Sequence, residues 1–193
     1  MCTGNLCRSP TLEQLLRLRL GEAFPDADIN VTSAGTHAYD GDPMDPGSAH
    51  EAERLGIRDA ERHRARRLVE PHVRDADLVL ALAREHRTAA VRLAPRAVGR
   101  AFTLLEFVRI VESLEPKDLV AGRDSATPEG RLRRVVEAAH RIRGLVASRR
   151  RSGMDVIDPH GREPDVYRAS ADTIDDACRR LIAVLPRLVD PPD

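Results

Sequence analysis

The chain has 193 residues, which suits one compact domain that needs neither disulfides nor metals to fold. Lys+Arg and Asp+Glu both total 31, so no global basic field attracts nucleic acid or an anionic membrane surface. No uncharged apolar run approaches the roughly 18 residues of a membrane span, and the first ten residues lack the apolar region of a secretory signal. The three cysteines form no even disulfide framework, and we expect a reduced, cytoplasmic protein.

Hydrophobic spacing predicts helices and strands that alternate along the chain. The expected elements are a helix from Pro10 to Gly21, a strand over 29–35, a helix from Pro46 to Leu55, a strand from Leu78 to Leu82, a helix from Glu85 to Leu93, a strand from Ala101 to Leu105, and helices over 128–148 and 171–185. Strands that alternate with helices predict an α/β fold in which helices flank a parallel sheet.

We expect a single domain over residues 1–193, with one departure from the alternating pattern. Residues 112–153 hold two turn-forming stretches and the arginine run 149–151, and we predict that they form a helical insertion carrying a surface helix. The arginine run suits a solvated face better than a partner-docking patch.

The segment Cys2–Pro10, of sequence CTGNLCRSP, combines residues that suit the binding of a dianion. Gly4 and Asn5 tolerate left-handed backbone, so the chain can curl into a ring before its proline opens the first predicted helix. Free N–H groups at a helix N-terminus favour a dianion, and Arg8 can bind two of its oxygens at once. The same positive surroundings favour the thiolate form of Cys2. The segment therefore predicts a nucleophile beside an oxyanion cradle.

This segment resembles the phosphate-binding loop of the low-molecular-weight protein-tyrosine phosphatases of bacterial type. Further stretches that resemble the family are VTSAGT at 31–36, HRARRL at 63–68, DADLVLAL at 75–82 and the late Asp-Pro at 158–159. The likeness runs from Cys2 to about Leu188 and is interrupted at 112–153. It implies that phosphotyrosine or a related aryl phosphate is hydrolysed through a cysteinyl-phosphate intermediate, without metal or other cofactor.

The resemblance also implies roles for individual residues. Cys2 becomes the nucleophile, Arg8 the phosphate clamp, and Asp158 the acid that protonates the leaving phenolate. Ser9 would hydrogen-bond the sulfur, and Asn5 would stiffen the loop. The implied substrate-binding residues are Thr3, Gly4, Asn5, Leu6, Cys7, Ser9 and Tyr39. The implied partners are a phosphotyrosine protein or a small aryl phosphate, and a cognate bacterial tyrosine kinase, but neither nucleic acid nor a membrane.

Several of these residues have a plainer interpretation. Asp158 could form only an Asp-Pro turn, and Tyr39 could be a structural loop residue instead of a wall for the phosphotyrosine ring. Cys7 could protect Cys2 as a reversible disulfide or simply pack against the loop. Cys178 lies on an apolar helical stripe and is predicted to be core. The seven histidines show no metal-ligand spacing, so we predict no metal site.

Two features depart from the family pattern. Relatives carry an apolar strand before the loop cysteine, whereas only Met1 precedes Cys2, so we expect the first strand to be truncated. Either the recorded start lies downstream of the natural one, which we favour, or the chain is a weakened and inactive form. His160 stands where many relatives have a tyrosine, and three Phe, two Tyr and no Trp leave few aromatic walls for an aryl phosphate.

Two other functions compete with phosphatase. Arsenate reductase uses a similar loop, but its thioredoxin-linked versions need two further cysteines, and only Cys178 is left for that. Versions that use an external thiol need no such pair, so this alternative stays open. A phosphoprotein-binding module would keep the loop without chemistry, although binding alone needs neither Cys2 nor Asp158.

Overall fold

The computed structural model describes residues 1–119, 127–147 and 153–189. Its α-helices are α1 (Arg8–Ala23), α2 (Pro46–Arg54), α3 (Glu70–Arg74), α4 (Arg84–Leu93), α5 (Leu104–Glu112), α6 (Pro128–Ala147) and α7 (Pro164–Val189). Its strands are β1 (Val79–Ala81) and β2 (Ala101–Thr103), and its short 3-10 helices are η1 (Ala60–Arg62), η2 (Pro95–Gly99) and η3 (Pro116–Asp118). No helix in the described ranges is long and apolar enough to cross a membrane.

A small parallel sheet lies at the centre of the molecule. β1 pairs in parallel with β2, and single parallel bridges join Cys2 to Gly35 and Gly35 to Arg67. Backbone bonds place Met1 beside the other edge of β1, since its nitrogen donates to the Leu80 carbonyl at 2.7 Å. The order across the sheet is therefore Arg67, Gly35, Cys2, β1 and β2, and Cys2 lies at its middle position.

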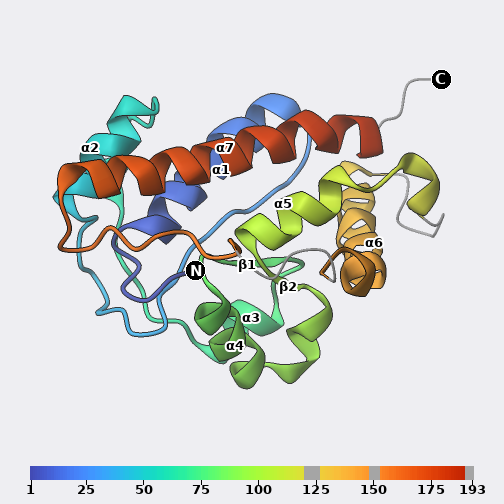
Figure 1. Ribbon diagram of the computed structural model, residues 1–193, viewed down its shortest axis with the longest axis horizontal. Helices are drawn as coiled ribbons and strands as arrows, with labels where there is room; N and C mark the ends of the chain where they lie inside the picture. The colour runs from blue at the N-terminus through green and yellow to red at the C-terminus, as the bar shows by residue number, and fades with distance from the viewer. Residues whose placement is uncertain (120–126, 148–152, 190–193) are drawn as a thin grey trace.

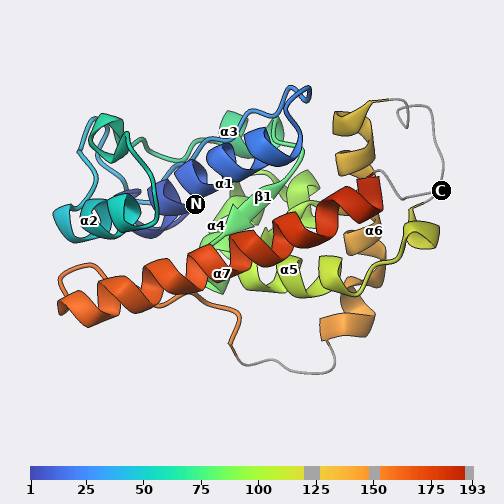
Figure 2. The same cartoon turned by 90° about the horizontal axis from the view of Figure 1, so that it is seen from above.

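Helices cover both faces of this sheet, as the predicted α/β fold requires. Figure 1 shows α1, α5 and α7 on one side of β1 and β2, with α3 and α4 on the other. Figure 2 shows α7 running alongside α1 and α5, with α2 near one end of it and α6 near the other. The main core lies beneath α7, where Leu15 of α1, Phe102 of β2 and Ile174 of α7 belong to one buried cluster. The prediction of a single-domain α/β fold is confirmed.

The strand predicted over 29–35 is wrong except at its last residue. Only Gly35 pairs with neighbouring chain segments in the sheet. Side chains occupy the carbonyls that a ladder would use, because Arg17 Nε donates to the Val31 carbonyl at 2.7 Å and Arg66 Nε to the Ser33 carbonyl at 2.6 Å. The segment is held by arginine side chains instead of a partner strand.

The strand predicted from Ala101 to Leu105 is also shorter than expected. Thr103 ends the strand by capping α5. The Thr103 hydroxyl accepts a hydrogen bond from the backbone N–H of Glu106, and the Glu106 carboxylate accepts one from the backbone N–H of Thr103. A capping box of this kind is visible in the sequence, and it explains why Leu104 begins a helix.

The predicted helix over 128–148 is present as α6, and it is not merely a surface helix. Its Val135, Ala138 and Ala139 are buried in the main core, where α6 packs against α5 and α7. The arginine run 149–151 lies outside the described residues. The assignment of residues 112–153 as an insertion stays a prediction.

Candidate active site

The segment Cys2–Arg8 forms a buried loop between the middle of the sheet and the first turn of α1. Cys2 is 2% exposed and Arg8 is 4% exposed. The Cys2 Sγ lies 3.0 Å from the hydroxyl of Ser9, which is in the first turn of α1. The residues of that turn include no acidic side chain that would offset the positive end of the helix dipole. The sulfur therefore sits beside a site that favours an anion.

Asn5 holds the loop in its curled shape. It adopts left-handed backbone, with φ of 57°, and is completely buried. Its side-chain amide donates to the hydroxyls of Ser9 at 2.9 Å and Ser33 at 2.7 Å, and its amide oxygen accepts from the Arg66 N–H at 3.0 Å. The Asn5 carbonyl lies 2.7 Å from Nε2 of His63. These contacts satisfy a buried polar side chain and preorganise the loop.

The neighbouring segment 36–45 borders the loop along its length. Its residues Thr36 and His37 donate backbone bonds to the carbonyls of Cys2 and Thr3, and Asp45 donates to that of Leu6. Tyr39 lies between these anchors and is 80% exposed. Its predicted role as a wall for a substrate ring stays a prediction.

Gly35 packs against the loop so closely that no side chain fits there. A Cβ at this position would lie 2.4 Å from the Thr3 carbonyl oxygen and 2.8 Å from the Asn5 nitrogen, both of them backbone atoms. We expect Gly35→Ala to lower the free energy of unfolding by about 1–3 kcal/mol and to weaken phosphate binding, because the loop must shift. Urea denaturation and titration calorimetry with inorganic phosphate measure the two effects.

Gly21→Ala on α1 is the matched control. A Cβ there meets no atom of the described residues within 4 Å, and alanine favours a helix by about 1 kcal/mol over glycine. Wild-type stability and phosphate binding in Gly35→Ala would contradict the close approach.

His86 of α4 contacts the loop from the far side of the sheet. Its Nε2 lies 2.9 Å from the Thr3 hydroxyl, and its ring is 2% exposed. Burial lowers the pKa of His86 to about 4, and the charge of Arg8 adds to the effect. A carboxylate oxygen of the largely exposed Glu85 lies 3.5 Å from the same nitrogen. Because the imidazole is neutral at pH 7, Glu85 and His86 form no ion pair at that pH.

Stability should therefore fall in acid through His86. Its pKa is lower in the folded chain than in the unfolded chain, so between about pH 6.5 and pH 4 the unfolded state binds more protons. We expect the wild type to lose about 2 kcal/mol more than His86→Gln between pH 7 and pH 4.5. Urea unfolding at both pH values measures this difference, and equal losses in the two proteins would contradict a buried neutral imidazole.

Asp158 reaches the loop from the segment that precedes α7. Its Oδ2 accepts from Arg8 Nη2 at 2.6 Å, and Arg8 Nη1 donates to the Val156 carbonyl at 3.3 Å. The segment is anchored where Val156 donates to the Leu82 carbonyl beyond β1, at 2.8 Å. Asp158 is 51% exposed while Arg8 is buried, so a carboxylate stands at the open side of an interior guanidinium. Phosphate oxygens and this carboxylate would bind the same groups on Arg8.

The other cysteines have different surroundings. Burial raises the pKa of Cys7 to about 12 and that of Cys178 to about 12. Cys178 is fully buried in the main core, as predicted. Cys7 instead lies in a cluster with Asp45 and His160, whose potential ligand atoms are all within 4.8 Å of one another. Spacing could not predict this cluster, because its members come from three separate segments.

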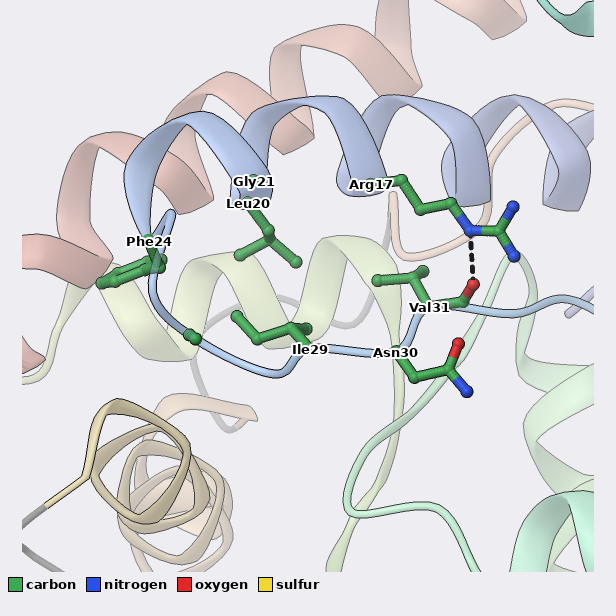
Figure 3. A pocket seen from close by; sticks show the side chains of 8 residues that line it. Arg17, Leu20, Gly21, Phe24, Ile29, Asn30 and Val31 are labelled. Carbon is green, nitrogen blue, oxygen red and sulfur yellow. Dashed lines mark hydrogen bonds between the residues drawn. The ribbon is translucent and has the colours of Figure 1, made fainter.

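A separate cavity of about 220 Å³ lies towards the other end of α1. Figure 3 shows it between the C-terminal half of α1 and residues 29–31, with the Arg17 to Val31 bond at its edge. Leu20 of its wall is about 18 Å along the helix from Arg8. It is no part of the loop site.

Comparisons with known proteins agree with this geometry. A family model described as low molecular weight phosphotyrosine protein phosphatase matches residues 1–118. The low molecular weight protein-tyrosine-phosphatase Etp of Escherichia coli (strain K12) is 34% identical over 116 residues, which are 60% of this chain and 74% of that protein. The protein-arginine-phosphatase of Geobacillus stearothermophilus is 28% identical over 181 residues, or 94% of this chain and 90% of that protein.

A solved structure extends the likeness to the second half of the chain. It is a YwlE arginine phosphatase mutant with a phosphorylated active site serine, 25% identical with a TM-score of 0.66. The alignment covers 94% of this chain and 90% of that chain, so it includes the part beyond residue 118 that the family model leaves unmatched.

Proposed function

Since the chain belongs to the low molecular weight phosphotyrosine protein phosphatase family, we propose that it removes phosphoryl groups from its substrate through a phosphorylated Cys2. The observation that carries this proposal is the 2.6 Å bond between Arg8 and Asp158. It brings a carboxylate from the segment before α7 to the loop that holds Cys2, so one site contains a thiol, a guanidinium and an acid.

The first step transfers the phosphoryl group to sulfur. The substrate dianion displaces Asp158 from Arg8 and binds the guanidinium together with the backbone N–H groups of the loop. The Cys2 thiolate attacks phosphorus and the P–O ester bond breaks. Asp158, which takes up a proton from solvent once it has left Arg8, donates that proton to the departing oxygen. Because Asp158 is half exposed at the open side of Arg8, its carboxyl can turn towards the leaving group.

The second step releases phosphate. The Asp158 carboxylate takes a proton from water, whose oxygen attacks phosphorus while the S–P bond breaks. Ser9, whose hydroxyl lies 3.0 Å from the sulfur, donates to the departing thiolate. The remaining loop residues Thr3, Gly4, Asn5, Leu6 and Cys7 contribute backbone N–H groups and shape to the phosphate site. The phosphorylated active site serine of the related YwlE mutant supports a covalent intermediate.

Phosphotyrosine on a protein is the first substrate candidate, and a cognate tyrosine kinase is the corresponding partner. The Escherichia coli relative, named a tyrosine phosphatase, supports it. Phosphoarginine is the second candidate, because the relative named an arginine phosphatase aligns with 94% of this chain whereas the Escherichia coli protein aligns with 60%. Asp158 would serve either substrate, since the leaving oxygen and the leaving guanidino nitrogen both need a proton.

Arsenate reduction receives less support from the geometry. A disulfide relay needs accessible cysteines, and Cys178 is buried in α7 with a pKa raised to about 12. A phosphoprotein-binding module remains the alternative without chemistry.

Rapid quench with a phosphotyrosine peptide and a phosphoarginine peptide, followed by mass spectrometry, tests the proposal. We expect a phosphoryl group on Cys2 within one turnover, with the preferred peptide giving the faster burst. If the protein binds phosphate but gives neither a phosphorylated Cys2 nor turnover with either peptide, the proposed enzymatic function is contradicted. That result would favour the phosphoprotein-binding module.

A further inference from the structure

Three potential metal ligands meet beside the phosphate loop. Cys7 is the last loop residue before Arg8, Asp45 precedes α2, and His160 follows the Asp-Pro turn. Cys7 Sγ lies 3.9 Å from His160 Nδ1, which lies 3.5 Å from Asp45 Oδ2. Thiolate, imidazole and carboxylate together form a set that suits Zn²⁺, whereas a thiolate disfavours Mg²⁺ and Ca²⁺.

Two of the three separations are close to those of a tetrahedral zinc site, and the third, between Cys7 Sγ and Asp45, is within 4.8 Å. Bonds of about 2.3 Å to sulfur and about 2.0–2.1 Å to nitrogen and oxygen place S and N about 3.6 Å apart, and N and O about 3.3 Å apart. The observed separations of 3.9 Å and 3.5 Å each exceed these by a few tenths of an ångström. His160 has a side chain that is 63% exposed, so it can close this gap and leave the fourth position to water.

The backbone at the start of α2 fixes one oxygen of Asp45, and the Tyr167 hydroxyl also interacts with this carboxylate. Its Oδ1 accepts from the backbone N–H groups of Gly47 and Ser48 at 3.0 Å and 3.3 Å, which fixes the carboxylate. Its Oδ2 is the oxygen that faces His160. Hydrogen bonds of this kind orient metal ligands in proteins.

We propose that Cys7, Asp45 and His160 bind Zn²⁺ and that the ion restrains the Asp-Pro turn against the phosphate loop. On binding, the Cys7 S–H bond breaks, a sulfur–zinc bond forms and the proton passes to the solvent. No electron is transferred.

The site connects to the chemistry through Asp158. The backbone N–H of His160 donates to Asp158 Oδ1 at 3.3 Å. An ion that holds the His160 side chain therefore also restrains the Asp158 carboxylate. Asp158 then stays on Arg8, and the guanidinium is withheld from phosphate. Zinc is therefore a reversible inhibitor. This consequence rests on the proposed function, whereas zinc binding itself does not.

Binding is tested without any activity, in the Cys2→Ser background, so that the loop nucleophile contributes no thiolate. We expect one Zn²⁺ per chain in competition with a chromogenic chelator, and a thiolate-to-metal band with tetrahedral d–d absorption when Co²⁺ is the probe. In that background His160→Gln and Asp45→Asn should each weaken zinc binding by at least about 100-fold, because each removes a ligand. Asparagine retains the α2 cap, so Asp45→Asn should still fold.

The exposed His50 on α2 is the control, and His50→Gln should bind zinc as its parent does. Parental zinc affinity in His160→Gln, or a cobalt spectrum without a thiolate band, overturns the site.

Activity then tests the restraint. With Cys2 restored, zinc at ten times its Kd should lower kcat/KM about tenfold, and the same concentration should lower that of His160→Gln less than twofold. Equal inhibition of the two proteins overturns the restraint. If neither protein turns over phosphate while zinc still binds, the proposed function fails and the metal site stands.

Discussion

Replacing Cys2 by serine is expected to lower kcat on an aryl phosphate by about 10⁴-fold or more. A serine hydroxyl at this position is not ionised at pH 7, so the attack on phosphorus loses its nucleophile. Phosphate affinity should remain within about threefold of the wild type, because Arg8 and the backbone N–H groups of the loop are unchanged. Steady-state assays and calorimetry with inorganic phosphate give the two values.

Cys178→Ser is the matched control for the loss of a thiol. Cys178 is a buried core residue of α7 and is not part of the loop, so this variant can lose stability but should keep kcat. Turnover by Cys2→Ser above a tenth of the wild-type rate would contradict a covalent mechanism at Cys2.

Asp158→Asn should lower kcat by about 10²–10⁴-fold on substrates whose leaving group needs a proton. The loss should shrink as the leaving phenol becomes more acidic, because a stable phenolate departs unprotonated. The same variant should bind inorganic phosphate more tightly, since the carboxylate no longer competes for Arg8 Nη2. A series of substituted phenyl phosphates and a phosphate titration measure these effects.

Asp165→Asn changes an exposed aspartate in the first turn of α7 and is the control. It should leave both kcat and phosphate affinity unchanged. A constant loss across all leaving groups in Asp158→Asn would contradict its role as an acid, and unchanged phosphate affinity would contradict the competition for Arg8.

The elements predicted well are those with local signals at their ends. Helix α2 is predicted from Pro46 to Leu55 and is found from Pro46 to Arg54, where Asp45 caps its start and Gly56 follows with φ of 91°.

The start of α7 is predicted less well. This helix begins at Pro164, seven residues before the predicted start, although a proline followed by an acidic residue is a local start signal.

The strand predicted over 29–35 failed for a different reason. Its alternating pattern is real, but strand pairing depends on which segments lie alongside, and here arginine side chains take carbonyls that a partner strand would use. Similarly, His63 and Ser33 lay in stretches that resembled the family, yet nothing in their spacing showed that both hold Asn5.

By itself, the sequence determined the α/β class and the loop from Cys2 to Arg8, because helix periodicity, turn residues and a phosphate-binding motif act within a few neighbouring positions. The tertiary structure alone decided that Asp158 reaches Arg8 and that His86 supports Thr3. It also decided that Cys7 meets Asp45 and His160. Such contacts join residues far apart in the chain, and they depend on how the helices pack on the sheet, which no local pattern encodes.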